Sequence, residues 1–387
     1  MPTASSHAAS YDEAVAGWAD HLRSGGTTTW SAWLAQPRPT APAAGPRPDA
    51  VHLELVRRLN LAAGQPVPGL ADRVLATASP GRGLVDVPLV WPAARRTYGS
   101  PAMDPEQLPE EELIRLAVGV VVHLLPGLPR PAARVPAQPW PWPWRRRFQL
   151  HGSPITADGL RRGLLERGLV DTDWRPTHVV VARPVEVMMA EHWAGNARNG
   201  GILKWSTLWR RVLAAGRLPR PVDVVSIADR LAGREREPLH VVVARDAQVA
   251  AETTARLLGT QPFVLHGTAD LARTDLQRRV NRLTALTAGA ESVKDLAARL
   301  ASVLAQGDLV PDPPRPPVVP PGAEDWARDQ AARTAAHLRA AGYAVHGNPD
   351  ELLPADHRHP GTVDRTRTLD LALAACLRTW RRQEGTP

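Results

Sequence analysis

The chain has 387 residues, of which 43% are hydrophobic, so it is long enough for two or three domains and apolar enough to bury a large core. With this hydrophobic content, global disorder is not expected. The formal net charge of +8 at pH 7 suits an acidic partner such as a nucleotide or nucleic acid, and it equally suits an ordinary soluble surface with surplus arginine.

The basic residues are almost all arginine. Lys204 and Lys294 are the only lysines, so 45 of the 47 basic residues are arginines. Together with 39 prolines, this bias is typical of a GC-rich genome such as that of an actinobacterium. An arginine in this chain is therefore weaker evidence for a binding site than it would be elsewhere.

Residues 1–125 are predicted to form a small, mostly helical module. Apolar residues recur at helical spacing over 14–22 and 55–59, and three glutamates at 110–112 open a further helix, where carboxylates complement the helix dipole. A short strand is predicted at 84–90. A Pro/Trp-rich stretch at 126–144 follows, and it is interpreted as a linker because proline interrupts helices and central strands.

Residues 145–387 are predicted to form an α/β domain with a three-layer parallel sheet. Strands are expected at 148–150, 178–182, 240–244 and 343–345, and continuous valine runs favour strands buried on both faces. Helices between them imply a doubly wound arrangement. The hexapeptide His-Val-Val-Val-Ala-Arg occurs twice, which fits either a duplication or two parallel strands under one constraint. Seven prolines at 311–321 predict an extended connection.

The cellular setting is predicted to be the cytoplasm. The single cysteine, Cys376, excludes an internal disulfide and lies in an apolar run, which indicates a packed helix residue and not a nucleophile. The N-terminus lacks the pattern of a signal peptide, and the apolar segment 113–125 is too short to cross a bilayer. No membrane association is expected.

Two arginines stand where ligands bind in an open parallel sheet, at the carboxyl ends of strands. Arg183 and Arg245 each follow a valine triplet and an alanine. A guanidinium in that position can donate a forked pair of hydrogen bonds to a phosphate or sulfate. Both are candidate ligand contacts.

Several separated blocks between about 148 and 380 resemble bacterial sulfotransferase-like proteins of the kind found in actinobacteria. The blocks are Thr177-His-Val-Val-Val-Ala-Arg183-Pro184, Glu191-His192-Trp193, Leu203-Lys204-Trp205, Pro238-Leu-His-Val-Val-Val243, and 326–354. The resemblance implies a P-loop-type fold and transfer of a sulfuryl group from phosphoadenosine phosphosulfate.

The family's donor site has two parts, and this chain matches them incompletely. Arg183 matches the arginine that binds the 3′-phosphate, but Glu191 stands where the family has a serine, and its carboxylate would repel a phosphate. The loop that would cradle the 5′-phosphosulfate is Leu150 to Thr156, before a helix predicted to start near Asp158, and it contains no lysine.

The resemblance therefore implies a degenerate donor loop. The remaining candidate contacts to a nucleotide, either the phosphosulfate donor or its bisphosphate product, are Gly152, Ser153, Thr156 and Arg183. The favoured hypothesis is a sulfotransferase-like protein that lacks sulfuryl transfer but keeps a nucleotide or anion site, or binds a partner protein. An active sulfotransferase, with Arg161 or Arg162 replacing the lysine, is a lesser alternative. No catalytic residue is assigned.

Three further patterns are candidates for phosphate-binding, acid–base or metal sites. Ser24 to Trp30 resembles part of a phosphate loop but follows a helix, so it is interpreted as a helix–helix turn with a threonine N-cap. His151 and His192 are candidates for acid–base chemistry if they converge. The spacing of Asp356 to His359 is a weak metal signal, and no metal is predicted.

A nucleic-acid-associated or regulatory protein is the alternative from another class. The observations that suggest it are the net charge, the helical N-terminal region and a cluster of aromatic and basic residues, Trp142, Trp144, Arg145, Arg146 and Arg147. The competing interpretation is a linker whose tryptophans pack between domains. Nucleic-acid binding is not the favoured prediction.

Overall fold

The structure is a computed structural model. It describes residues 4–36, 49–77, 87–91, 102–131, 145–233, 239–265, 269–305, 314–355 and 361–385. The Trp-rich part of the predicted linker and the Asp356–His359 segment lie outside the described residues, as do residues 84–86 of the predicted strand at 84–90. Of that strand, Leu89 forms an isolated parallel bridge with Met103.

The chain divides into two compact units. Unit 1 comprises Met1–Pro131, Arg279–Asp312 and Asp364–Pro387, and unit 2 comprises Ala132–Arg278 and Pro313–Val363. The sequence-based division assigned everything after residue 145 to the α/β domain. The contacts instead group residues 279–312 and the last helix with the N-terminal helices.

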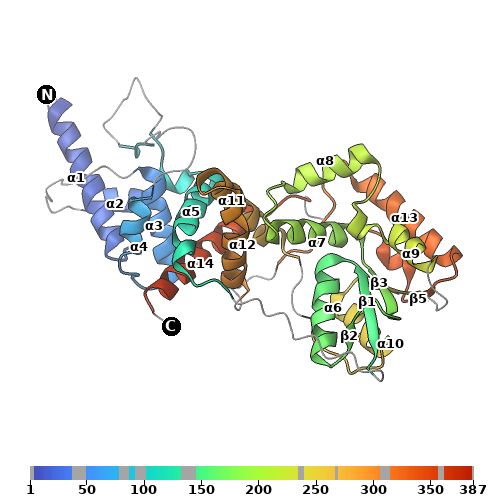
Figure 1. The fold of residues 1–387 in the computed structure, drawn as a ribbon. Coiled ribbons are helices and arrows are strands. Elements are labelled where there is room, and N and C mark those ends of the chain that lie inside the picture. The colour runs from blue at the N-terminus through green and yellow to red at the C-terminus, as the bar shows by residue number, and fades with distance from the viewer. Residues whose placement is uncertain are drawn as a thin grey trace. The chain divides into compact units, whose positions relative to one another are not determined.

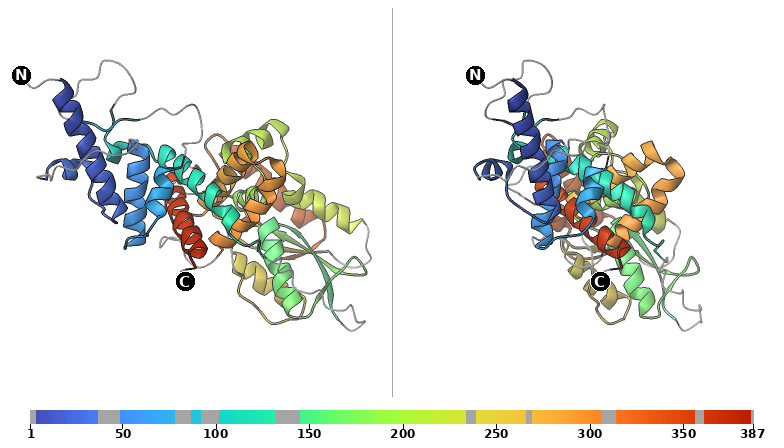
Figure 2. Two further views of the ribbon diagram at one scale, coloured as in Figure 1. Left: turned by 60° about the vertical axis from the view of Figure 1, so that its left-hand side comes forward. Right: turned by 90° about the vertical axis from the view of Figure 1, so that its left-hand side faces the viewer.

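Unit 1 is helical. Its elements are α1 (Ala4–Arg23), α2 (Trp30–Leu34), α3 (Ala50–Ala63), α4 (Leu70–Leu75), η1 (Pro105–Gln107), α5 (Glu110–Leu124), η2 (Leu125–Gly127), α12 (Ala290–Leu304) and α14 (Arg365–Gln383). Helix α14 runs beside α5 although they are distant in sequence (Figure 2). Cys376 of α14 is fully buried against Ala117 of α5, and burial raises the pKa of its thiol to about 12, which makes it a packing residue.

Two features of unit 1 follow directly from local sequence. Glu110, Glu111 and Glu112 occupy the first turn of α5, where carboxylates complement the helix dipole. Thr29 is the N-cap of α2, and its hydroxyl accepts a hydrogen bond from the Ala32 amide at 3.3 Å. The Ser24–Trp30 segment is therefore a helix–helix turn, as predicted.

Unit 2 is built on a sheet of five parallel strands. They are β1 (Arg147–Gly152), β2 (Val170–Asp171), β3 (Thr177–Ala182), β4 (His240–Val243) and β5 (Ala344–His346). Their order is β2-β1-β3-β4-β5, which is the order of flavodoxin-like doubly wound sheets. The parallel α/β fold predicted from the valine runs is confirmed, with β3 and β4 as inner strands.

Helices cover both faces of this sheet (Figure 1). They are α6 (Pro154–Glu166), α7 (Val185–Arg198), α8 (Trp205–Ala215), η3 (Arg220–Val222), α9 (Val224–Ala232), α10 (Ala247–Leu257), α13 (Glu324–Ala340) and η4 (Pro349–Leu352), while α11 (Leu271–Thr287) carries the chain from unit 2 into unit 1. One face packs against α6 and α10 around Phe148, and the other against α7, α8, α9 and α13 around Trp193 and Trp209. These layers bury the valines of β3 and β4 completely, which explains why the strands show no polar alternation.

The two identical hexapeptides lie on neighbouring strands but are out of register by one residue. Val179 pairs with His240, although the residue equivalent to His240 is His178. Because paired residues share a face and successive residues alternate, equivalent side chains point to opposite faces. His178 accordingly contacts His151 of β1 on one face, and His240 contacts His346 of β5 on the other, with ring nitrogens 3.2 and 3.1 Å apart.

Within the described part of the chain, no helix has the length and apolar character needed to cross a membrane.

Candidate functional site

The carboxyl ends of β1 and β3 lie at the point where the strand order changes direction, which is where doubly wound sheets bind ligands. Gly152 ends β1 with φ of +95°, and a Cβ there would stand 2.1 Å from the Val181 carbonyl oxygen of β3. Only glycine fits this close approach. Helix α6 then begins at Pro154, four residues earlier than the start predicted near Asp158. The predicted loop from Leu150 to Thr156 is therefore divided between the end of β1 and the first turn of α6, with Ser153 between them.

The amino terminus of α6 is occupied by the carboxylate of Glu191 from α7. Its Oε2 accepts hydrogen bonds from the Ser153 hydroxyl at 2.7 Å and from the amides of Ile155 and Thr156 at 3.0 and 2.9 Å. Its Oε1 accepts one from the Thr156 hydroxyl at 2.6 Å and pairs with Arg183 Nη1 at 2.7 Å. Glu191 is fully buried.

This arrangement brings the predicted nucleotide contacts together around a protein group. Gly152, Ser153, Thr156 and Arg183 all lie at the β1–α6 and β3–α7 junctions. Amides at a helix amino terminus attract an anion, and here the anion is the chain's own carboxylate. The polar atoms that would cradle a phosphate are already bonded to Glu191.

A cavity of about 290 Å³ lies beside this cluster, at the carboxyl ends of β3 and β4. We call it the strand-end pocket. Its lining combines basic, acidic and proline residues: Arg183, Glu186, Val187, Arg245, Ala269, Pro314, Arg315, Pro316, Pro317 and Ala355.

Glu186, in the first turn of α7, is the one carboxyl group among the described residues that line this pocket. Its side chain is only 2% exposed, and its Oε2 has no hydrogen-bond partner within the described chain. Burial raises the pKa of Glu186 to about 7, although the Ala355 amide, 3.4 Å from Oε1, and the nearby charges of Arg245 and Arg183 oppose that rise. The group can therefore gain or lose a proton near neutral pH.

The two strand-end arginines also face this pocket. Arg183 Nη2 donates to the Arg245 carbonyl at 2.8 Å, while its Nε is buried without a partner among the described residues. Arg245 donates to the Leu353 carbonyl at 2.6 Å, and its Nη1 lies 3.8 Å from Glu186 Oε1. Unpaired buried polar atoms cost about 1–3 kcal/mol each, so Arg183 Nε and Glu186 Oε2 mark places where a ligand could bond.

The other predicted site residues are not part of this pocket. Arg161, a candidate replacement for the missing lysine, is paired with Asp158 and Asp171, both at 2.7 Å. His151 contacts His178, whereas His192 lies 3.2 Å from the Asn196 side chain, so each histidine has its own partner. No group of three potential metal-ligating side chains gathers among the residues that the structure describes.

The basic run next to the predicted linker is used inside unit 2. Arg145 donates to the Gly168 carbonyl at 2.8 Å, and Arg146 donates to the Leu258 carbonyl at 2.5 Å. The Arg147 guanidinium stacks 3.9 Å from the centre of the Trp174 ring. These contacts anchor the start of β1.

Sequence reasoning did not identify Glu186 as a site residue. Its only local signal is its position three residues after Arg183, at the amino terminus of the helix that follows β3. The pocket that it lines is completed by Pro314–Pro317 and Ala355, which are more than a hundred residues away in sequence.

No family model matches the chain, and neither a curated protein nor a solved structure matches it.

Proposed function

We propose that unit 2 is a binding module for a small anionic ligand of the nucleotide class, held in the strand-end pocket. The observation that carries the proposal is the meeting of three groups in one cavity at the carboxyl ends of β3 and β4. These groups are the side chains of Arg183, Glu186 and Arg245, of which Arg183 Nε and Glu186 Oε2 are buried and have no hydrogen-bond partner among the described residues. Arginine is suited to phosphate and sulfate groups because its fork of donors matches their oxygens.

Glu186 gives this site a proton-linked character. A bound anion raises the pKa of a neighbouring carboxyl group, because like charges disfavour the ionised form. Since the pKa of Glu186 is already about 7, binding would be accompanied by proton uptake, and the neutral carboxyl would donate a hydrogen bond to the ligand. Affinity is therefore expected to rise as the pH falls from about 8 to about 6.

The Glu191 contacts support binding without sulfuryl transfer. Transfer requires preorganised positive groups free to neutralise the moving charge. Here the α6 amides and one side of Arg183 are bonded to the Glu191 carboxylate. The proposal includes a sulfotransferase-like ancestry in which sulfuryl transfer has been lost, and it rests on the blocks from Thr177 to Pro354. It also places the protein in the cytoplasm, on the basis of the single buried cysteine.

The test is calorimetric titration with adenosine 3′,5′-bisphosphate, in two buffers of different ionisation enthalpy so that proton uptake is measured directly. We expect micromolar binding, weakened about tenfold or more in Arg245→Gln because one charge-assisted contact is lost. Glu186→Gln should keep binding but lose the proton uptake. Arg333→Gln, an exposed arginine of α13 outside the pocket, is the matched control.

Two results would overturn the proposal. One is no binding at millimolar ligand while thermal unfolding shows the protein to be folded. The other is equal weakening by Arg245→Gln and Arg333→Gln, which would indicate only a general attraction to the basic surface.

A further inference from the structure

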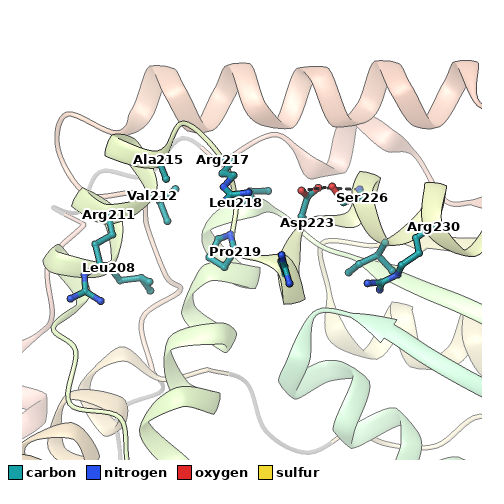
Figure 3. Close-up of a pocket in the computed structure, with 12 residues that line it drawn as sticks. Leu208, Arg211, Val212, Ala215, Arg217, Leu218, Pro219, Asp223, Ser226 and Arg230 are labelled. Atoms are coloured by element: carbon teal, nitrogen blue, oxygen red, sulfur yellow. Dashed lines mark hydrogen bonds between the residues drawn. The ribbon is translucent and has the colours of Figure 1, made fainter.

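A second cavity in unit 2 lies away from the strand ends, between α8, η3 and the start of α9 (Figure 3). Its volume is about 360 Å³, and it shares no lining residue with the strand-end pocket. We call it the arginine pocket. It is lined by Leu208, Arg211, Val212, Ala215, Arg217, Leu218, Pro219, Arg220, Asp223, Ser226, Ile227 and Arg230.

The four arginines of this pocket are Arg211, Arg217, Arg220 and Arg230, and all four are exposed. Within the described residues, none of their guanidinium groups makes a hydrogen bond or ion pair to the protein. By contrast, Arg161, Arg183 and Arg278 are paired with carboxylates at 2.7 Å. Exposed arginines without such a partner in the described part of the chain also occur elsewhere in unit 2, for example Arg162 and Arg256, but here four of them line one cavity.

The only carboxylate in the pocket is committed to a structural role. Asp223 caps α9, accepting from the Ser226 amide at 3.2 Å and from the Ser226 hydroxyl at 2.6 Å. Four arginines against this one aspartate give the lining a net charge of +3. Arg230 extends this field, because its charge contributes to lowering the pKa of His151.

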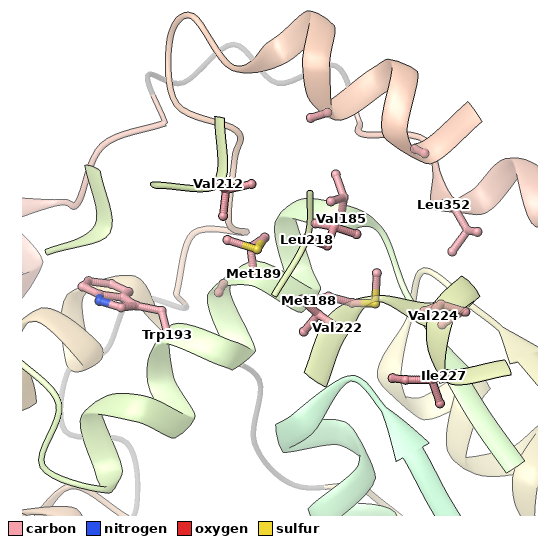
Figure 4. Packing of buried hydrophobic residues seen from close by; sticks show 14 of the residues in the cluster. Val185, Met188, Met189, Trp193, Val212, Leu218, Val222, Val224, Ile227 and Leu352 are labelled. Atoms are coloured by element: carbon pink, nitrogen blue, oxygen red, sulfur yellow. The ribbon is translucent and has the colours of Figure 1, made fainter. Parts of the chain in front are cut away.

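The floor of the arginine pocket is apolar and fixed. Val212, Leu218 and Ile227 are at most 7% exposed and belong to the core that packs against α7 (Figure 4). A cavity with an apolar floor and a few charged groups at its rim, in this size range, is typical of a small-molecule site and not of a nucleic-acid groove. The ligand must therefore combine a compact organic body with several negative charges.

We propose that the arginine pocket binds a second small organic polyanion, one that carries two or more phosphate groups on a body that packs against Val212, Leu218 and Ile227. This inference does not depend on a ligand in the strand-end pocket. Each phosphate would bond guanidinium groups that have no other partner, so binding disrupts no ion pair of the folded protein.

The test compares two pocket arginines, Arg211 on α8 and Arg230 on α9, with Arg210, which neighbours Arg211 on α8. The probes are adenosine 5′-triphosphate and inorganic pyrophosphate, titrated by calorimetry into the full chain. We expect the double variant Arg211→Gln/Arg230→Gln to weaken triphosphate binding by about tenfold or more. Arg210→Gln, next to Arg211 on α8 but outside the pocket and bonded to Thr207, should change it less than about twofold. Pyrophosphate should bind more weakly, because it lacks the organic body.

Three outcomes would overturn the inference. They are equal weakening by Arg210→Gln, no triphosphate binding at millimolar concentration, and binding of a single-stranded DNA oligonucleotide in preference to the triphosphate. Unchanged thermal unfolding of the variants shows that they are folded.

A further variant distinguishes binding in the arginine pocket from binding in the strand-end pocket. Arg245→Gln should leave the triphosphate site in the arginine pocket intact, and loss of all triphosphate binding in that variant would count against the inference. Conversely, loss of adenosine 3′,5′-bisphosphate binding in Arg211→Gln/Arg230→Gln alone would overturn the proposed function and leave the arginine pocket standing.

Discussion

Glu186 and Glu191 lie on the same helix, α7, and both are buried, yet their surroundings are opposite. The Glu191 carboxylate accepts five hydrogen bonds, two from amides, two from hydroxyl groups and one from Arg183. Glu186 has one long backbone contact and a partnerless Oε2. The contrast distinguishes a carboxylate that completes the fold from one that faces a cavity.

The difference also shows where an anionic ligand could bind without displacing existing contacts. At the α6 amino terminus, an incoming phosphate would have to displace a carboxylate that already has its full set of donors. At the strand-end pocket, a ligand would relieve unsatisfied groups and cause no such loss. Two clusters that share Arg183 are therefore predicted to respond very differently to substitution.

The largest effect is expected for Glu191→Ala. Removing this carboxylate leaves Arg183 buried without its counter-ion, which typically costs about 3–5 kcal/mol of unfolding free energy. Urea unfolding measures the loss. Because the vacated position is at a helix amino terminus, added sulfate should restore part of the stability of the variant and do less for the native protein.

Glu324→Ala is the control for that rescue. Glu324 is exposed at the start of α13 and accepts from the Gly322 amide at 2.6 Å, so its removal should cost about 1 kcal/mol or less, with no specific sulfate effect. A loss of similar size in both variants would show that the Glu191 contacts are not a distinct anion position.

An intermediate effect is expected for Glu186 as the pH changes. Its folded-state pKa is raised from 4.5 to about 7, so the folded protein binds more protons than the unfolded chain between these values. Its contribution to stability is complete below pH 4.5 and is lost as the pH rises through 7. The unfolding free energy changes by at most about 3 kcal/mol, because each pKa unit corresponds to about 1.36 kcal/mol. As the pH rises from 4.5 through 7, the unfolding free energy of the native protein should fall relative to that of Glu186→Gln. A difference between the two proteins that does not depend on pH would contradict the assignment.

The smallest effect, with the opposite sign, is expected for His151. Burial, followed by the neighbouring His178, lowers its pKa from 6.5 to about 4. Its contribution is therefore complete above pH 6.5 and is lost as the pH falls through 4. Because the side chain is partly exposed, we expect about 1–2 kcal/mol, measured as the acid-side difference between the native protein and His151→Gln. A difference of the same size above pH 6.5 would contradict the assignment.

Much of the fold could be predicted because its signals are local. The valine triplets after His178 and His240 indicate doubly buried strands, and helical periodicity locates α1 and α3. Strand β2, at Val170–Asp171, is too short to leave a pattern. The start of α6 was placed late because Pro154, read as part of a loop, occupies the first helical position, where its missing amide hydrogen costs nothing.

The candidate site was less accessible to sequence reasoning. Arg183 was identified from its position at a strand end, and Glu191 from the family pattern. That Glu191 itself fills the α6 amino terminus depends on how α6 packs against α7. The arginine pocket left no sequence signal, because Arg211 and Arg230 cannot be told from the general arginine bias until α8 and α9 bring them to one cavity.

The one-residue stagger of the identical hexapeptides relates the two halves of the inner sheet by an approximate two-fold screw axis, parallel to the strands and between β3 and β4, with a translation of one residue. His151-Gly152 ends β1 and His346-Gly347 ends β5, and a Cβ at either glycine would lie 2.1 Å from a carbonyl oxygen of the adjacent inner strand. The axis exchanges the two faces and relates Arg183 to Arg245. In sequence, however, the His-Gly pair precedes the hexapeptide in one half and follows it in the other, so tandem duplication does not produce this symmetry. Shared constraints on parallel strands are sufficient to account for the repeated hexapeptide.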